Sequence, residues 1–202
     1  MLSQTKQPAM KKLPFILLIF ISVSVCSQDR SKFLYAEFSD RSITLYPFTR
    51  IGGSTFDPVV TLGGGIDYKQ KRHSILFQTF QLSGYSDGFS SVGWNISSSI
   101  GYRFPNNSGF FGEVMAGICA SAFFSEKATF IQEDDGRYVQ ANPVHIVGGI
   151  PFDFLIGYSK GKYSFYIKYR YMAEGPLSEN LPVLSTSTIG IGIRCSLTSK
   201  TN

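Results

Sequence analysis

The chain has 202 residues, of which 16% are charged, 15% are aromatic and 20 are glycines. A charged fraction below the roughly 25% of ordinary soluble domains favours a β-rich or membrane-associated chain. Outside the leader described next, 16 basic residues stand against 14 acidic ones. With no basic stripe left, we expect no nucleic-acid partner.

Residues 1–27 have the pattern of a secretory signal peptide. A pair of lysines precedes an apolar run at residues 13–25, and small residues follow it. This run is too short for a transmembrane helix, which needs about 20 residues. We therefore expect cleavage after Ser27 and a single exported domain at residues 28–202.

Two alternatives stay open for this leader. Cys26 could be the lipid-modified residue of a lipoprotein, although the bulky Val25 before it fits such processing poorly. Translation could also begin at Met10, which would remove residues 1–9 from the protein.

Alternation of apolar and polar residues recurs along the exported domain and predicts eight β-strands. Clusters of Gly, Pro, Asn and Ser separate the runs, as turns do. The expected strands span residues 33–46, 59–68, 74–84, 91–104, 110–123, 144–158, 163–172 and 185–197. In the first strand the alternation breaks at Ser39–Asp40, which predicts a bulge; a turn that splits residues 33–48 into two strands is the alternative. The third strand, 74–84, fits either parity.

The segment at residues 91–104 places large apolar side chains on one face and small polar ones on the other. In the strands that share this alternation, the ionisable side chains all fall on the second face; they are Asp67, Arg103, Glu113, His145, Asp153, Lys168, Arg170 and Arg194. A cation at the lipid-facing midplane of a membrane costs about 2–4 kcal/mol, so lipid contact enforces such a separation. Repeated glycines on the polar face relieve crowding inside a narrow closed sheet. We therefore expect lipid against Trp94 and Phe154, and a tight lumen on the other side.

The connections between the strands alternate in length. Those at residues 69–73, 105–109 and 159–162 are short, and the longest spans residues 124–143. Aromatic residues of the apolar face gather beside the short turns; they are Tyr68, Tyr102, Phe104, Phe110, Tyr158 and Tyr163. Short turns at one end with an aromatic girdle beside them are typical of bacterial outer-membrane barrels.

In its leader, strand number, loop alternation and girdle, the chain resembles the eight-stranded OmpA/OmpX-like outer-membrane β-barrel proteins. The resemblance implies an all-β, antiparallel up-and-down transmembrane barrel in the outer membrane of a Gram-negative-type cell. It also implies a monomer surrounded by outer-membrane lipid. The chain departs from the family at its end, because the last strand stops near Leu197 and a polar tail follows. A soluble exported β-sandwich or ligand-binding barrel also separates its faces and is the alternative.

The luminal charges are predicted to form pairs. If Lys160–Gly161 is a two-residue turn, Asp153 lies opposite Lys168. Arg103 and Glu113 become diagonal neighbours across the short turn between them. We expect a salt-bridged filling, because eight strands enclose barely more room than their own side chains need.

A conduction path lined by Arg170 and Arg194 is the alternative to this filling. The two cysteines outside the leader have a simpler interpretation. Cys119 points inward and Cys195 points outward on strands that are not neighbours, so we expect no disulfide between them.

No catalytic residue is predicted. His73 and Ser74 are adjacent at a short turn, so their side chains point to opposite faces. His145 lies near the outer rim, but Asp153 is eight residues away. At about 3.3 Å per residue this separation is beyond hydrogen-bond reach. Glu126, from a loop, could approach His145 instead.

We also expect no cofactor and no metal ion. Asp134, Asp135 and Gly136 lie at the centre of residues 129–141, which resemble a hairpin tip. Calcium loops need more oxygen ligands at set spacings, so these acids are interpreted as part of a solvated turn.

The sequence therefore favours a nonenzymatic outer-membrane barrel with a structural role or a role in surface contact or adhesion. Residues 125–142 are the expected contact with an extracellular or envelope partner. The alternative is a barrel enzyme that acts on lipid or peptide at its outer rim, with His145 as the residue to test.

Overall fold

The structure of the chain is a computed structural model that describes residues 31–43, 57–71, 73–86, 91–125, 130–132, 138–140, 144–175 and 184–197. The predicted signal peptide, with its Cys26 and Met10 alternatives, lies outside the described residues. So do the loop acids Glu126, Asp134 and Asp135, and the polar tail after Leu197.

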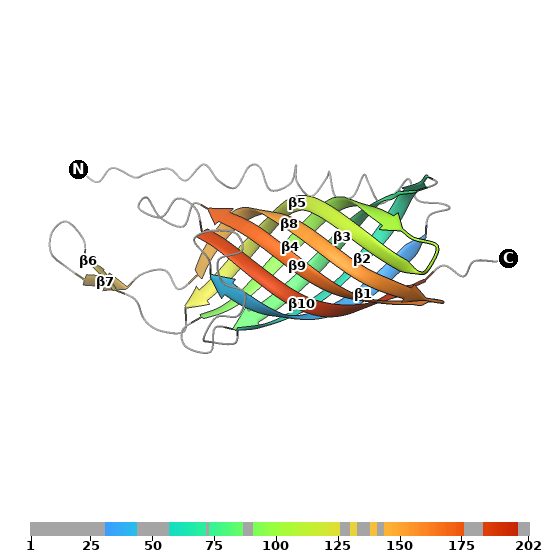
Figure 1. The fold of residues 1–202 in the computed structure, drawn as a ribbon. Helices are drawn as coiled ribbons and strands as arrows, with labels where there is room; N and C mark the ends of the chain where they lie inside the picture. Colours follow the sequence, from blue (N-terminus) through green and yellow to red (C-terminus); the bar gives the residue numbers. More distant parts are fainter. Residues whose placement is uncertain are drawn as a thin grey trace. The chain divides into compact units, whose positions relative to one another are not determined.

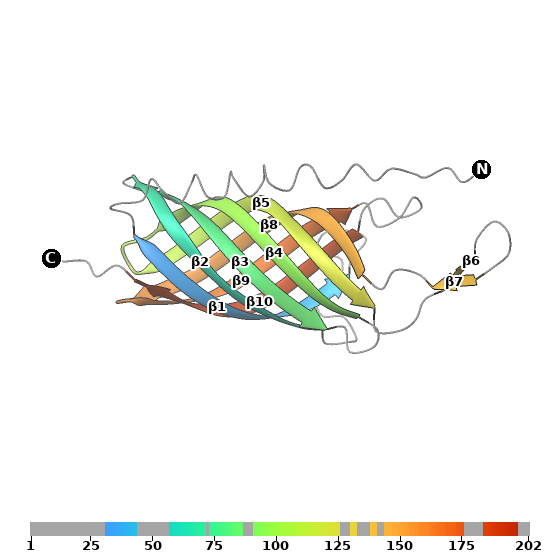
Figure 2. The same cartoon turned by 180° about the vertical axis from the view of Figure 1, so that it is seen from behind.

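Eight long strands close into an antiparallel barrel in the order β1-β10-β9-β8-β5-β4-β3-β2. The strands cross the barrel obliquely, and opposite sides of the wall are seen in Figures 1 and 2. They are β1 (Lys32–Ile43), β2 (Pro58–Gln70), β3 (Ile75–Ser86), β4 (Ser91–Pro105), β5 (Phe110–Ser125), β8 (Val144–Lys160), β9 (Tyr163–Gly175) and β10 (Leu184–Ser196). The predicted eight-stranded antiparallel barrel is confirmed.

Two short strands, β6 (Phe130–Gln132) and β7 (Tyr138–Gln140), lie in the chain between β5 and β8. They pair with each other, from Phe130 opposite Gln140 to Gln132 opposite Tyr138, and form a sheet separate from the barrel. The segment interpreted as a hairpin tip thus contains a hairpin with strands of its own.

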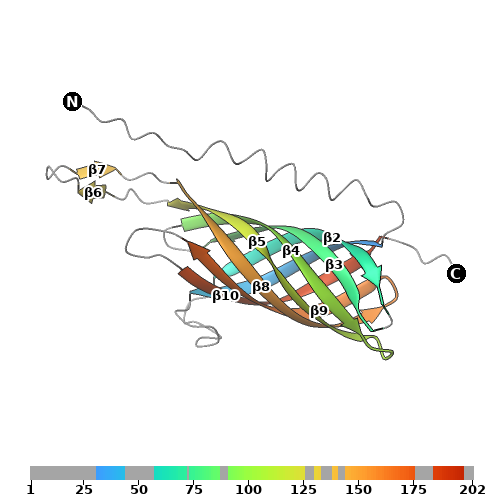
Figure 3. The same cartoon turned by 90° about the horizontal axis from the view of Figure 1, so that it is seen from above.

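The first and last long strands close the barrel. β1 pairs with β10 without interruption, from Phe33 opposite Ser196 to Ile43 opposite Thr186, and Figure 3 shows the closed wall from a third direction. Closure leaves the wall without a free edge, so the strands satisfy one another's backbone donors and acceptors. In the described part of the chain, no helix is long and apolar enough to cross a membrane.

The β2–β3, β4–β5 and β8–β9 turns, which the sequence predicts to be short, lie at one end of the barrel, which we call the short-turn end; the opposite end is the loop end. Two of these turns depend on glycine in a left-handed backbone conformation, Gly109 with a φ of 90° and Gly161 with a φ of 63°. Glycine has no Cβ and adopts such angles without steric penalty. The turn between β8 and β9 is made of Gly161 and Lys162, since Lys160 pairs with Tyr163.

The bulge predicted at Ser39–Asp40 is wrong. β1 keeps one register against β2 and against β10 through this point. Ser39 points into the barrel and is buried, and Asp40 points outward at the loop end, where its Oδ1 accepts a 3.0 Å hydrogen bond from the backbone N–H of Asp57. The alternation therefore continues, and β1 is a single strand up to Ile43. Residues 44–48 lie outside the described residues.

The parity of β3, which the sequence left open, is set by its neighbours. Phe77, Thr79 and Gln81 point inward and are buried. Gln78 therefore lies on the outer face, where its Nε2 donates a 3.0 Å hydrogen bond to Ser98 Oγ of β4. This pairing satisfies two polar side chains on an otherwise apolar exterior.

The outer face of the wall is apolar and exposed. Trp94 has an exposed fraction of 50% and Phe154 of 50%, although both are large apolar side chains. The aromatic residues predicted beside the short turns lie on this face, and the rings of Phe110 and Tyr158 pack 5.1 Å apart. An exterior of this kind is unfavourable in water and suits a hydrocarbon environment.

The inner face alternates glycine with large side chains of the adjacent strands. A Cβ at Gly63 would lie 2.4 Å from the ring of Tyr35, one at Gly65 2.2 Å from Phe33, and one at Gly192 2.3 Å from Tyr166. The rings therefore occupy the space that a side chain would need. The predicted role of luminal glycine in relieving crowding has this structural basis.

Gly117 and Gly112 on β5 give a matched test of this packing. A Cβ at Gly117 would lie 2.1 Å from the backbone oxygen of Ser98, whereas one at Gly112 would have its nearest neighbour at 3.9 Å. Gly117→Ala should lower the free energy of unfolding by about 1–3 kcal/mol, and Gly112→Ala should change it by no more than about 0.5 kcal/mol. Urea titration followed by the fluorescence of Trp94, the single tryptophan, measures both. Equal unfolding midpoints for the two variants would contradict the packing described here.

Candidate functional site: the charged interior of the barrel

The inner face of the described barrel carries five acidic and five basic side chains that form ion pairs. They are Glu37, Asp67, Glu113, Asp153 and Glu174, with Arg41, Arg103, Lys168, Arg170 and Arg194. All except Asp67 and Arg103, which are half-buried, are buried. The charges balance, and each acid has a basic neighbour. This arrangement supports a packed interior in place of a charged channel.

A cluster near the short-turn end centres on Glu113. Its carboxylate accepts two hydrogen bonds from Arg194, at 2.5 and 2.9 Å, and one from Arg103 Nε at 2.5 Å. Arg103 also lies 3.5 Å from Asp67 Oδ2. Because Glu113 is only 2% exposed, these bonds replace the water that the carboxylate loses on folding.

Aromatic rings enclose the two arginines of this cluster. The guanidinium carbon of Arg194 lies 4.4 Å from the ring centre of Phe33, and that of Arg103 lies 5.0 Å from Phe77. Phe111 also contacts both guanidinium groups, at 5.7 and 5.8 Å. Cation–π contacts of this kind stabilise a cation that is shielded from water. The short-turn end of the barrel is therefore filled by rings and ion pairs together.

The register of the β4–β5 hairpin brings Arg103 and Glu113 directly opposite each other. The sequence had placed them as diagonal neighbours. Either arrangement is within reach of the two long side chains, and the observed contact is the 2.5 Å bond from Arg103 Nε. The structure thus brings together this candidate pair.

The predicted pairing of Asp153 with Lys168 is wrong. Asp153 lies opposite Arg170, whose Nε and Nη2 donate hydrogen bonds of 2.5 and 2.7 Å to its carboxylate. Lys168 lies opposite Leu155 and forms an ion pair with Glu37 of β1 instead. The physical reason is the turn: the loop uses Gly161 as its first residue, so each partner in β9 moves by two positions. An even shift keeps every side chain on its predicted face.

The loop-end half of the interior is built around Glu174. Ser121 donates a hydrogen bond to Glu174 Oε1, and Asn95 Nδ2 donates one of 2.8 Å to Ser121. Arg41 lies 3.9 Å from Glu174 Oε2 and stacks over the ring of Tyr85 at 4.1 Å. This half is therefore held by a looser set of contacts than the Glu113 cluster.

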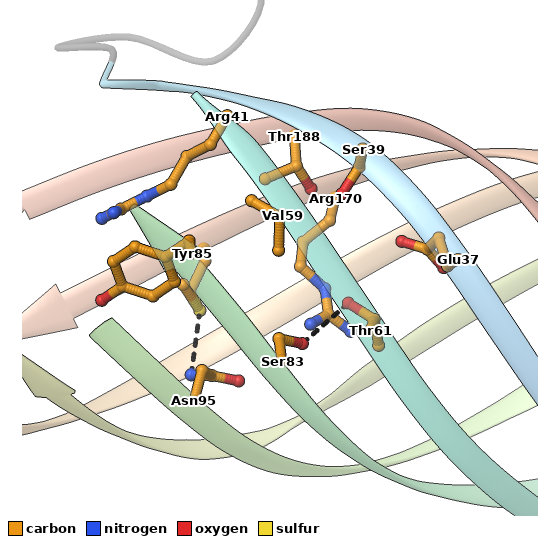
Figure 4. A pocket seen from close by; sticks show the side chains of 11 residues that line it. Glu37, Ser39, Arg41, Val59, Thr61, Ser83, Tyr85, Asn95, Arg170 and Thr188 are labelled. Atoms are coloured by element: carbon orange, nitrogen blue, oxygen red, sulfur yellow. Dashed lines mark hydrogen bonds between the residues drawn. The ribbon is translucent and has the colours of Figure 1, made fainter. Parts of the chain in front are cut away.

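A small cavity lies within this part of the interior and is shown in Figure 4. Its volume is about 30 Å³, and its lining includes Arg41, Tyr85, Asn95 and Arg170. Hydrogen bonds between Thr61 and Ser83 and between Asn95 and the sulfur of Met172 cross its wall. At roughly 10–15 Å³ per water, about two water molecules would fit.

The cavity is far too small for a solute. Arg170 and Arg194, the residues of the alternative conduction path, are both buried and are bound to carboxylates, Asp153 and Glu113 respectively. The geometry of the described barrel thus favours the salt-bridged filling over a pore.

The histidines considered for catalysis are not joined to an acid by the described structure. His145 is exposed and pairs across the sheet with Phe123, whereas Asp153, on the same strand, is buried against Arg170. His73 is exposed in the turn between β2 and β3. Within the described ranges, no three His, Cys, Asp or Glu residues lie close enough together to hold a metal ion.

The two cysteines are free thiols. Cys119 lies on the inner face, where its sulfur is 3.5 Å from that of Met172, and Cys195 lies on β10 opposite Leu34. Their separation onto different strands and faces follows the sequence-based expectation.

Three luminal charges were not predicted from the sequence. For two of them, the alternation of residues along the strand indicates an inward position. Glu37 and Arg41 share the parity of Phe33 and Tyr35, but the assumed bulge interrupted the alternation between them. Glu174 lies just beyond the predicted end of its strand, which continues to Gly175. Contacts across the lumen, such as Tyr35 donating to Gln81 at 2.9 Å, leave no signal in the spacing of residues.

No protein-family model matches the sequence, and no curated protein matches it significantly. Solved structures do match. Neisserial surface protein A has a TM-score of 0.54 and 14% identity, over 82% of this chain and 96% of that chain. Ail of Yersinia pestis, crystallised with the heparin analogue sucrose octasulfate, has a TM-score of 0.52 and 8% identity, over 84% and 100%. The outer-membrane enzyme PagL has a TM-score of 0.49 and 11% identity, over 81% and 98%.

At these identities the likeness concerns the fold. The chain has the fold of the eight-stranded outer-membrane β-barrels, and the resemblance stated from the sequence is confirmed at that level.

Removal of Glu113 should strongly destabilise the barrel. Glu113→Gln leaves Arg103 and Arg194 without their shared anion, and breaking a buried ion pair costs about 3–5 kcal/mol. Urea titration of the folded protein measures the change. The exposed Lys162→Gln serves as the control and should stay within about 0.5 kcal/mol of the unmodified protein.

A double-mutant cycle measures the direct interaction between Glu113 and Arg194. The double variant Glu113→Gln/Arg194→Gln should lose less stability than the sum of its two single variants, because the residues share one interaction. Additive losses would contradict a direct ion pair.

Proposed function

We propose that the protein is a nonenzymatic integral outer-membrane barrel that acts through contacts made by its extracellular loops. The single observation that carries this proposal is the interior of the described barrel: its charges are balanced and paired, and the cavity among them holds only about two water molecules. A filled barrel serves as a membrane anchor. The chemistry available for recognition then lies in the connections at the loop end.

The membrane placement rests on the exterior. Each of the eight strands exposes large apolar side chains on the outer face, while the barrel's ionisable side chains, apart from those at its ends, are turned inward. Lipid-facing cations would cost about 2–4 kcal/mol each near the midplane, so this arrangement suits a hydrocarbon environment. The short-turn end would face the periplasm, and export would use the leader at residues 1–27.

Residues 125–142 are the loop segment most suited to binding a partner. This segment contains four acidic and two basic residues, and it includes the β6–β7 hairpin. Its net negative charge favours a neutral or basic partner surface. The sulfated ligand crystallised with Ail is an anion and needs a positively charged binding surface. The fold likeness to Ail therefore does not transfer that ligand to this chain.

Trp94 should lie in contact with acyl chains. In vesicles, brominated phospholipids should quench the fluorescence of Trp94, whereas a water-soluble quencher should have little effect. The signal is specific because the chain has one tryptophan. Quenching by the aqueous reagent alone would contradict the membrane placement, and migration of the unheated protein as a compact band in gels provides the check that the barrel is folded.

The loop contact is tested by site-specific photocrosslinking on intact cells. A photoreactive residue at Val139 in β7 should form adducts with a surface partner, whereas the same group at Asn107 in a short turn should not. Deletion of residues 130–140 should abolish the adducts without changing the compact gel band. No adduct from any position in residues 125–142, together with altered lipid A or lost peptidase activity in His145→Ala, would favour the rim enzyme.

A further inference from the structure

The charged residues outside the lumen are distributed unequally between the two ends of the barrel. At the short-turn end, Lys32, Lys71, Lys160 and Lys162 are exposed. They come from the start of β1, from the β2–β3 turn and from the β8–β9 turn, and so are spread around the rim.

The acids of this end are inside the barrel and already paired. Asp67 lies 3.5 Å from Arg103, and Glu113 is bound by Arg103 and Arg194. Outside the lumen, the described residues at the short-turn end include no acid. At the loop end the structure describes two further acids outside the luminal ion pairs, Asp40 and Asp57. The rim lysines therefore give the short-turn end a positive surface.

These lysines lie at the depth where a membrane has its headgroups. Lys160 lies two residues after the girdle residue Tyr158, and Lys162 directly precedes the girdle residue Tyr163. Aromatic girdles mark the interface between hydrocarbon and water. Lysine side chains extend their ammonium groups from such positions toward the polar layer. The carbon chain of each lysine thus meets the hydrocarbon edge while its charge reaches the phosphate level.

We propose that the short-turn rim is a binding surface for anionic phospholipids such as phosphatidylglycerol, with Lys71, Lys160 and Lys162 as the residues that bind the headgroups. The proposal rests on the membrane placement given above. Each lysine near an anionic membrane surface strengthens binding to that surface about fivefold. Three of them, at the β2–β3 and β8–β9 turns, select the lipid of one leaflet and fix the depth and orientation of the barrel.

The experiment uses the full mature chain in phosphatidylcholine vesicles that contain a trace of spin-labelled lipid. The fraction of label immobilised by the protein is compared for phosphatidylglycerol and phosphatidylcholine. We expect about a fivefold preference for the anionic label in low salt. Added salt should reduce it, because screening weakens exposed charges.

Matched variants identify the residues responsible. The triple variant Lys71→Gln/Lys160→Gln/Lys162→Gln should lose most of the preference, and the triple Lys→Arg variant at the same positions should keep it. Equal immobilisation of both labels by the unmodified protein overturns the proposal. So does a preference that survives the glutamine changes, or one that the arginine variant loses.

Two controls keep this result separate from the proposal on membrane placement. Insertion into pure phosphatidylcholine, followed by the compact gel band and by Trp94 quenching, tests placement without any anionic lipid. If the triple glutamine variant does not fold, the salt dependence in the unmodified protein decides: a preference unaffected by salt overturns a role for the lysines.

Discussion

The constraint on which the rest of the structure depends is the closure of eight strands into one narrow sheet. Closure fixes two populations of side chains, because each residue points either into the lumen or out of it. The lumen is so narrow that glycine must alternate with rings such as Tyr35 and Tyr166. Charges placed inside have little water around them and need partners. The ion pairs of Glu113 and Asp153 are therefore part of the packing of the barrel.

The interior is most closely packed where aromatic rings and ion pairs lie together. Glu113 accepts three hydrogen bonds from Arg103 and Arg194, whose guanidinium groups also contact aromatic rings. Around Glu174 the ion pair with Arg41 is longer, at 3.9 Å, and the small cavity lies in that half. A firm short-turn end and a less tightly filled loop end suit an anchor whose variable, partner-facing chemistry is carried by loops.

Much of the fold could be predicted because period-two alternation is a local property of the sequence. The strand number, the faces of β4, β5, β8 and β9, and the luminal position of Glu113 follow from it. The register of a hairpin is set by which residues form the turn. A turn that begins at Lys160 would place Lys168 opposite Asp153, whereas the observed turn, which begins at Gly161, places Arg170 there. Pairs between strands that are not neighbours, such as Lys168 of β9 with Glu37 of β1 on the far side of β10, depend on closure and cannot be inferred from neighbouring residues.

The two-residue turn at Gly161–Lys162 limits how this gene can change. A single inserted or deleted codon there would rotate β9 by one side-chain position, which turns Lys168 and Arg170 toward hydrocarbon and Ile167 into the charged lumen. At the opposite end, the β1–β2, β5–β8 and β9–β10 connections are longer in the sequence, so a change of one residue there does not by itself shift the register of a hairpin. During evolution, insertions and deletions should therefore accumulate on one side of the membrane only. Related sequences whose loops have diverged completely should keep the same number of residues in this turn.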